Sequence, residues 1–181
     1  MRPCVFFDRD GIVNESPGPG YVERWEDFHL LPDFIAILRI VRRLGFAAVV
    51  VTNQRGVATG RMTAATVDDI HRRLAAALKA EGLALDDILY CPHDRNACDC
   101  RKPKPGLLLE AARRHDLDLG RSWMVGDSAT DVEAGRAAGC RTILVAPPAP
   151  AIASDLRFDT LAELRSALEE MRIEMTRKDA G

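Results

Sequence analysis

The sequence predicts an α/β fold, a three-layer Rossmann-like parallel sheet with helices on both faces. Five short apolar runs alternate with helix-like segments along the 181 residues, and this order is typical of such sheets. The run FAAVVVT at 46–52 is apolar almost throughout, as strands covered on both faces are. Polar side chains follow several of these runs, at the strand ends where α/β sheets bind ligands.

Two strands and two helices are predicted in the first half of the chain. The apolar run PCVFFD at 3–8 is β-prone and ends in a glycine-containing turn. The segment that starts near Pro32 has apolar residues at helical spacing and stops at Gly45. After the strand at 46–52, Thr63 is suited to cap an alanine-rich helix that ends at Gly82.

Three further strands and three further helices are predicted in the second half. The strands are expected at 86–91, 122–127 and 141–146, and the helices at about 106–115, from 128 to Gly139, and after Thr160. Pro105 suits a first helical turn, and Thr160 with Glu163 forms the pattern of a capping box. The proline-rich stretch 147–150 reads as a surface connection, and the segment 172–181 as a fraying tail.

The composition of the chain argues against a nucleic-acid-binding protein and against a membrane protein. A net charge of −2 and a pI near 6.1 provide no basic field for a nucleic-acid backbone. No apolar run approaches the roughly 18–20 residues that cross a bilayer, and the N-terminus lacks the pattern of a signal peptide. We therefore expect a cytoplasmic monomer with one domain over 1–181, and neither nucleic-acid nor membrane partners.

Polar residues at successive strand ends predict a phosphoryl-transfer site. Asp8 and Asp10 follow the first strand, Thr52 and Asn53 the second, and Asp127 the fourth. Asp8 can serve as a carboxylate nucleophile, and Asp10 can exchange a proton with the leaving oxygen and with water. Asp127 offers an oxygen ligand for Mg²⁺.

Two further residues suit the same chemistry. Thr52 can donate a hydrogen bond to phosphoryl oxygens, and Lys102 can neutralise the charge that builds up on them. Taken singly these features have ordinary explanations, because an Asp-x-Asp pair is usually a solvated turn and Asp127 could simply cap a helix. Their order along the strand ends favours the functional interpretation.

Four motifs resemble those of the haloacid dehalogenase (HAD) superfamily. They are FFDRDGIVN, VVVTNQRGVATGRMT, CRKPKPG and MVGDSATDVEAGRAAG, and the resemblance covers nearly all of residues 5–146. It implies a phosphatase that forms an aspartyl-phosphate on Asp8, with Asp10 as acid/base and Thr52 and Lys102 as stabilisers. It implies Mg²⁺ bound by Asp8, by the backbone carbonyl of Asp10 and by Asp127. Asp131 is expected to support the loop rather than bind metal.

The segment CPHDRNACDC at 91–100 predicts a structural zinc site. Its three thiols and one imidazole, from Cys91, His93, Cys98 and Cys100, form a complete tetrahedral ligand set. Chance clustering is the alternative. A zinc-bound loop at this place would position Arg101 and Lys102.

The remaining cysteines and histidines have no such pattern. Cys4 and Cys140 lie in strand contexts and are expected to be inert core residues. His29, His71 and His115 are expected at the surface or in packing rather than in catalysis.

The loop also resembles that of one HAD subgroup, which contains heptose-1,7-bisphosphate phosphatases and histidinol-phosphate phosphatases. The motif TNQRGVATG and Arg101 are similar to the heptose enzymes, whereas the four-residue gap between His93 and Cys98 is similar to the histidinol type. Ser128 departs from the lysine that many heptose enzymes have there, and the loop before Tyr21 is longer than usual.

No segment is long enough for a cap domain, so an open site bordered by 14–22, 54–61 and 93–101 is expected. Its substrate would be a small phosphorylated metabolite, and arginines 55, 61 and 101 could hold a second phosphate. Substrate contacts are expected from Asn53, Arg101, Arg55, Ser128 and Tyr21. The resemblance favours removal of the 7-phosphate of heptose 1,7-bisphosphate. The alternatives are a histidinol-phosphate phosphatase and a catalytically silent, zinc-stabilised binding protein.

Overall fold

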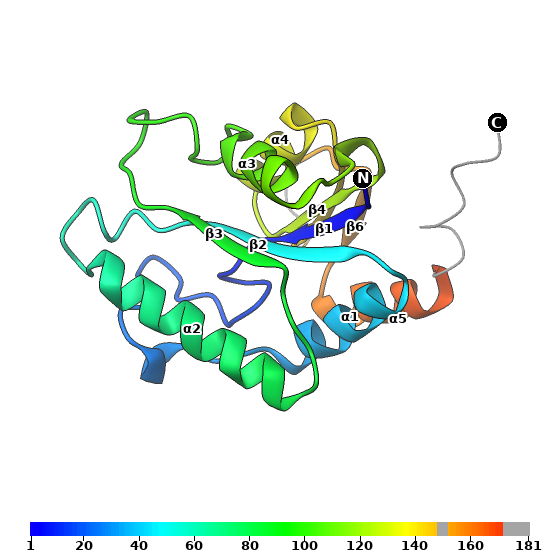
Figure 1. The fold of residues 1–181 in the computed structure, drawn as a ribbon, viewed down its shortest axis with the longest axis horizontal. Coiled ribbons are helices and arrows are strands. Elements are labelled where there is room, and N and C mark those ends of the chain that lie inside the picture. The colour runs from blue at the N-terminus through cyan, green and yellow to red at the C-terminus, as the bar shows by residue number, and fades with distance from the viewer. Residues whose placement is uncertain (148–151, 172–181) are drawn as a thin grey trace.

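A six-stranded parallel sheet forms the centre of the computed structural model, which describes residues 1–147 and 152–171. The strands are β1 (Cys4–Phe7), β2 (Ala47–Asn53), β3 (Asp87–Cys91), β4 (Trp123–Gly126), β5 (Arg141–Val145) and β6 (Leu156–Phe158). Their order across the sheet is β3-β2-β1-β4-β5-β6 (Figure 1). The predicted parallel sheet is confirmed.

Helices cover both faces of the sheet (Figure 1). They are α1 (Pro32–Arg43), α2 (Ala64–Ala80), α3 (Gly106–His115), α4 (Ala129–Ala137) and α5 (Leu161–Met171), with short 3-10 turns at Trp25–Asp27 and Leu119–Arg121. The apolar residues of α1, α2 and α5 form one core cluster with the sheet, and those of α3 and α4 form a second. Between the described elements there is no segment that builds a cap over the strand ends.

Alternation along the strands assigns side chains to the two cores. In β1, Val5 and Phe7 point into the cluster with α1, whereas Cys4 and Phe6 point into the cluster with α3 and α4. All four are at most 2 % exposed. Because both faces of the sheet are covered, β1 is apolar throughout and β2 is apolar up to Val51, which is the pattern that predicted these two strands.

The predicted helix boundaries agree closely with the structure. Thr63 caps α2 by accepting the backbone N–H of Thr66 at 3.1 Å. The capping box of α5 is displaced by one residue: Thr160 accepts the N–H of Glu163, but the carboxylate of Glu163 accepts the N–H of Asp159. Both hydrogen bonds give an acceptor to a backbone N–H group at the start of the helix, as a capping box would.

Strand β6 is the one described strand that the sequence did not predict. Its three residues, LRF, carry no recognisable periodicity, and the strand exists through pairing with β5, as in Val145 opposite Phe158. The carboxylate of Asp155 accepts both the N–H and the hydroxyl of Thr142, which fixes the entry to the strand. Of the segments expected to be irregular, 148–150 and 172–181 lie outside the described residues.

The chain order places three strand ends side by side. The chain runs outward from β1 through β2 to β3 and then returns to β4 on the other side of β1. The carboxyl ends of β2, β1 and β4 are therefore neighbours, at the kind of switch point where α/β sheets bind ligands. Within the described ranges, none of the helices combines the length and the apolar character that a bilayer crossing requires.

Candidate active site

Asp8 directly follows β1, and its carboxylate contacts the buried ammonium group of Lys102. Its Oδ1 accepts a hydrogen bond from Lys102 Nζ at 2.7 Å. Burial raises the pKa of Asp8 to about 7, opposed by the charge of Lys102 and reinforced by that of Asp131. The carboxylate therefore relies on the lysine for its ionised form.

Lys102 is held from several sides. Its side chain is 2 % exposed, and its ammonium group also contacts the carbonyl of Val51 at 2.8 Å and Asp131 at 2.6 Å. Its backbone is clamped by Asn53, whose amide accepts the N–H and donates to the carbonyl of Lys102, both at 3.0 Å. Despite burial, the charges of Asp131 and Asp8 raise the pKa of Lys102 above its usual value, so it remains charged.

Asp127 follows β4 and approaches the turn after β1. Gly11, with φ at +90°, makes room for it, because a Cβ on Gly11 would lie 2.1 Å from Asp127 Oδ2. Burial, reinforced by the charge of Asp131, raises the pKa of Asp127 to about 6. Only glycine fits this turn.

Asp131 and Ser128 form the start of α4. The backbone N–H of Ser128 donates to Asp131 Oδ2 at 3.1 Å, and its hydroxyl donates to the same oxygen at 2.5 Å. The other oxygen of Asp131 contacts Lys102. Asp131 therefore supports the loop and the lysine together.

The carboxylate of Asp10 is surrounded by N–H donors. Arg9 donates from Nε and NH2 at 3.1–3.2 Å, Asn14 Nδ2 donates at 3.0 Å, and Gln54 Nε2 donates at 3.1 Å. The same Gln54 amide donates to Thr52 Oγ1 at 2.9 Å. Since that bond uses an acceptor position, the hydroxyl hydrogen of Thr52 is available to a phosphoryl oxygen.

Three carboxylates at the strand ends could hold a cation. One oxygen each of Asp8, Asp127 and Asp131 lie within 4.8 Å of one another. Hard oxygen ligands of this kind suit Mg²⁺.

The predicted zinc ligands converge in the structure. Cys91 Sγ lies 3.4 Å from Cys98 Sγ, and His93 Nδ1 lies 3.3 Å from Cys100 Sγ. Tetrahedral zinc with Zn–S bonds of about 2.3 Å places its sulfurs about 3.8 Å apart, close to these separations. Burial raises the pKa of Cys98, but hydrogen bonds from Cys100 and Cys91 outweigh it and lower that pKa to about 6. The donor set therefore fits a closed zinc site.

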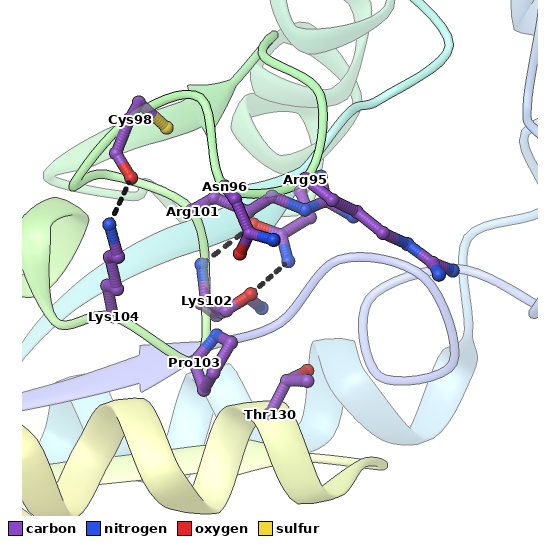
Figure 2. Close-up of a pocket in the computed structure, with 9 residues that line it drawn as sticks. Arg95, Asn96, Cys98, Arg101, Lys102, Pro103, Lys104 and Thr130 are labelled. Carbon is purple, nitrogen blue, oxygen red and sulfur yellow. Dashed lines mark hydrogen bonds between the residues drawn. The ribbon is translucent and has the colours of Figure 1, made fainter.

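Two cavities with shared lining residues open at this edge of the sheet. The first, which we call the acidic cavity, is lined by Asp8, Asp10, Ser16, Pro17, Gly18, Gly20, Tyr21, Thr52, Asn53, Lys102, Asp127, Thr130 and Asp131. The second, the basic cavity, is lined by Asn53, Arg95, Asn96, Cys98, Arg101, Lys102, Pro103, Lys104 and Thr130 (Figure 2). Three residues, Asn53, Lys102 and Thr130, belong to both.

Two predicted substrate residues have other partners. Arg55 forms an ion pair with Asp94 at 2.5 Å, and Ser128 caps α4; neither lines either cavity. Arg61, considered for a second phosphate, pairs with Glu23 at 3.1 Å. The structure thus brings Tyr21, Asn53 and Arg101 to the cavities, but not Arg55 or Ser128.

Other residues near the site were not predicted. Arg9, Asn14 and Gln54 surround Asp10, and His71 contacts Arg9 at 3.2 Å. His71 is 7 % exposed, consistent with the expected packing role. The quoted motifs contain Arg9, Asn14 and Gln54, but charged and amide residues in turns usually face solvent, so no local pattern indicated that they would be buried.

Comparison with known proteins agrees with this geometry. The HAD-hydrolase-like family model matches residues 99–147, which include Lys102 and Asp127. The crystal structure of a D,D-heptose 1,7-bisphosphate phosphatase from B. bronchiseptica, complexed with magnesium and phosphate, superposes with a TM-score of 0.82 at 32 % identity. That match covers 93 % of this chain and 98 % of the other. Fold and site together define a HAD-like phosphatase.

Full-length relatives identify the branch of that class. A D-glycero-α-D-manno-heptose-1,7-bisphosphate 7-phosphatase of Mycobacterium bovis is 39 % identical over 93 % of each chain. The β-anomer enzyme of Escherichia coli K12 is 36 % identical over 94 % of this chain and 95 % of its own. The chain belongs to the heptose-1,7-bisphosphate 7-phosphatase family.

The contact between His71 and Arg9 predicts acid sensitivity of the fold. Burial, and then the charge of Arg9, lower the pKa of His71 to about 3, against about 6.5 in the unfolded chain. Below pH 6.5 the unfolded chain therefore binds a proton that the folded chain does not, so stability falls from pH 6.5 toward pH 3. By pH 5 the loss attributable to His71 is about 2 kcal/mol.

Urea unfolding at pH 8 and pH 5 measures this loss. His71→Gln has no imidazole to protonate, so its stability should fall by about 2 kcal/mol less over the same interval. Equal losses in the two proteins would show that His71 is not buried in its neutral form.

Proposed function

We propose that this chain removes the 7-phosphate of D-glycero-D-manno-heptose 1,7-bisphosphate through an aspartyl-phosphate intermediate on Asp8. One observation carries the proposal: an acidic cavity suited to phosphoryl transfer shares three lining residues with a basic cavity suited to a second phosphate. The names of the full-length relatives support the same substrate. The catalytic unit is proposed to be the whole chain, as one domain.

Asp8 is the proposed nucleophile. Its contact with Lys102 favours the carboxylate form. Attack forms a bond between a carboxylate oxygen and phosphorus and breaks the bond between phosphorus and the sugar oxygen. Lys102 and the hydroxyl of Thr52 are placed to stabilise the charge on the equatorial phosphoryl oxygens.

Asp10 is the proposed acid/base. It lines the acidic cavity two residues beyond Asp8, and in protonated form it delivers a proton to the departing sugar oxygen. The resulting carboxylate then takes a proton from the water that attacks the aspartyl-phosphate. Inorganic phosphate leaves, and both aspartates return to their starting forms.

Magnesium fits the same place. Asp8, Asp127 and Asp131 bring three carboxylates together against the single buried charge of Lys102. Burial, with the charge of Asp131 adding to it, raises the pKa values of Asp8 and Asp127. Asp8, Asp127 and the backbone carbonyl of Asp10 are the proposed ligands. Bound Mg²⁺ supplies positive charge that relieves the repulsion between the carboxylates and the phosphoryl group.

The second phosphate is proposed to occupy the basic cavity. Arg95, Arg101 and Lys104 line it (Figure 2), and arginine pairs well with phosphate oxygens. Structural zinc bound by Cys91, His93, Cys98 and Cys100 is proposed to hold in place the loop that carries Arg95 and Arg101. A histidinol phosphate has no second phosphate for these side chains to bind.

Replacement of Asp8 tests the nucleophile. Asp8→Asn keeps the side-chain shape but lacks an anionic oxygen, so magnesium-dependent phosphate release should fall by on the order of 10³-fold or more, with the fold intact by circular dichroism. In wild-type protein quenched during turnover, borohydride should reduce the aspartyl-phosphate and convert Asp8 to homoserine, measured by mass spectrometry. Near-normal activity of the variant, or no reduction of Asp8 in the quenched wild-type protein, would contradict the assignment.

Replacement of Arg101 tests the substrate. Arg101→Ala should raise KM for either anomer of heptose 1,7-bisphosphate by about 10- to 100-fold, because a charge-assisted hydrogen bond is lost. KM for p-nitrophenyl phosphate, which has one phosphate, should change little. Arg61→Ala is the matched control, since Arg61 pairs with Glu23. Faster hydrolysis of histidinol phosphate than of both heptose anomers would overturn the substrate assignment while leaving the chemistry standing.

Metal analysis tests the zinc site. Purified protein should contain about one zinc per chain, and Cys98→Ser should lose it and melt about 5–10 °C lower. Cys140→Ala is the control, because Cys140 is buried away from the cluster and should leave the zinc content unchanged. Full stability in zinc-free wild-type protein would refute a structural metal.

A further inference from the structure

Arg9, which separates Asp8 from Asp10 in the sequence, is a charged residue with no exposed surface. Taking a guanidinium out of water costs several kcal/mol unless its donors find acceptors. Three of its contacts are defined: the Asp10 carboxylate, the ring nitrogen of His71, and the ring of Phe28, whose centroid lies 5.8 Å from Arg9 Cζ. Together these contacts restrict the rotation of the guanidinium group.

The contact with His71 defines how the imidazole is protonated. Arginine is always charged and can only donate, so His71 Nε2, 3.2 Å from Arg9 NH1, must be the acceptor. The imidazole is then neutral, with its proton on Nδ1. Burial and the charge of Arg9 both keep it in that form.

Helix α2 supplies His71, yet His71 does not line the acidic cavity. It is nevertheless one contact away from Asp10, through Arg9. Asn14 and Gln54 add single hydrogen bonds to the same carboxylate, whereas Arg9 donates to both of its oxygens. Arg9 therefore sets the plane of the carboxylate, and His71 sets Arg9.

We infer that His71 is a positioning residue for catalysis: through Arg9 it holds the Asp10 carboxylate in the orientation needed to protonate the leaving oxygen. This inference rests on the proposed role of Asp10 as general acid. It assigns no contact between His71 and the substrate.

Leaving-group dependence separates this role from a structural one. A sugar oxygen leaves poorly without a proton, whereas p-nitrophenolate leaves readily. His71→Leu removes the acceptor, so kcat/KM for heptose 1,7-bisphosphate should fall by roughly 10- to 100-fold, part of what general acid catalysis contributes. For p-nitrophenyl phosphate it should fall by no more than about threefold. KM for both esters should stay within about twofold, since no binding contact is lost.

A pair of polar variants provides the rescue test. His71→Gln places an oxygen near the position of Nε2 and should restore the sugar-phosphate rate to within about threefold of wild type. His71→Asn is equally polar but too short to reach Arg9, and should behave like His71→Leu. If the leucine variant does not fold, the comparison of these two variants decides the question. Leu78→Ala, buried on the same helix, is the control for destabilisation alone and should slow both esters equally.

Three outcomes would be decisive. Equal losses on the two esters in His71→Leu or His71→Asn would reduce His71 to a packing residue and overturn the inference. The inference also fails if His71→Gln is as impaired as His71→Asn. Asp10→Asn serves as the reference for the premise: if it shows no leaving-group dependence, the general-acid role within the proposed function fails, and the positioning role fails with it.

Discussion

The ammonium group of Lys102 is buried among the carboxylates of Asp8 and Asp131 and the carbonyl of Val51, and the arrangement of the site depends on it. A lysine without water around it is stable only if its three hydrogens find acceptors. Here two hydrogen-bond acceptors lie at the ends of β1 and β2, and an ion-pair partner, Asp131, lies at the start of α4. The lysine therefore joins the strand ends at the same time as it supplies charge to Asp8.

Lys102 is itself carried by a loop, so the sheet must hold that loop in place. Asn53 at the end of β2 does so through two hydrogen bonds to the backbone of Lys102. The loop also packs closely against the start of α3, where a Cβ on Gly106 would lie 2.3 Å from the carbonyl oxygen of Asp99. The Cys and His cluster lies directly before this segment. The cluster and Lys102 thus lie on the same connection between β3 and α3.

Much of the fold and of the central site could be predicted because both follow from short-range patterns. Buried parallel strands are continuous apolar runs, and a parallel sheet brings their carboxyl ends together, so Asp8, Thr52 and Asp127 could be placed near one another from sequence. Strand β6 escaped prediction because three residues carry no periodicity, and its existence depends on pairing with β5.

The substrate side of the site is less predictable for a related reason. Arg55 forms an ion pair with Asp94, which lies 39 residues away on another loop, and Arg9 contacts His71, which lies 62 residues away on α2. No local sequence pattern predicts such pairs, because the sequence around an arginine in a turn does not indicate whether its side chain faces solvent, a ligand or another part of the chain. Residues fixed by the sheet therefore carry chemistry that can be read from their order, whereas residues fixed by contacts between loops acquire their roles only in the folded structure. Under the proposed function, the side chains of the loop that lines the basic cavity would set the substrate preference, whereas Asp8, Thr52 and Asp127 are placed by the strand ends.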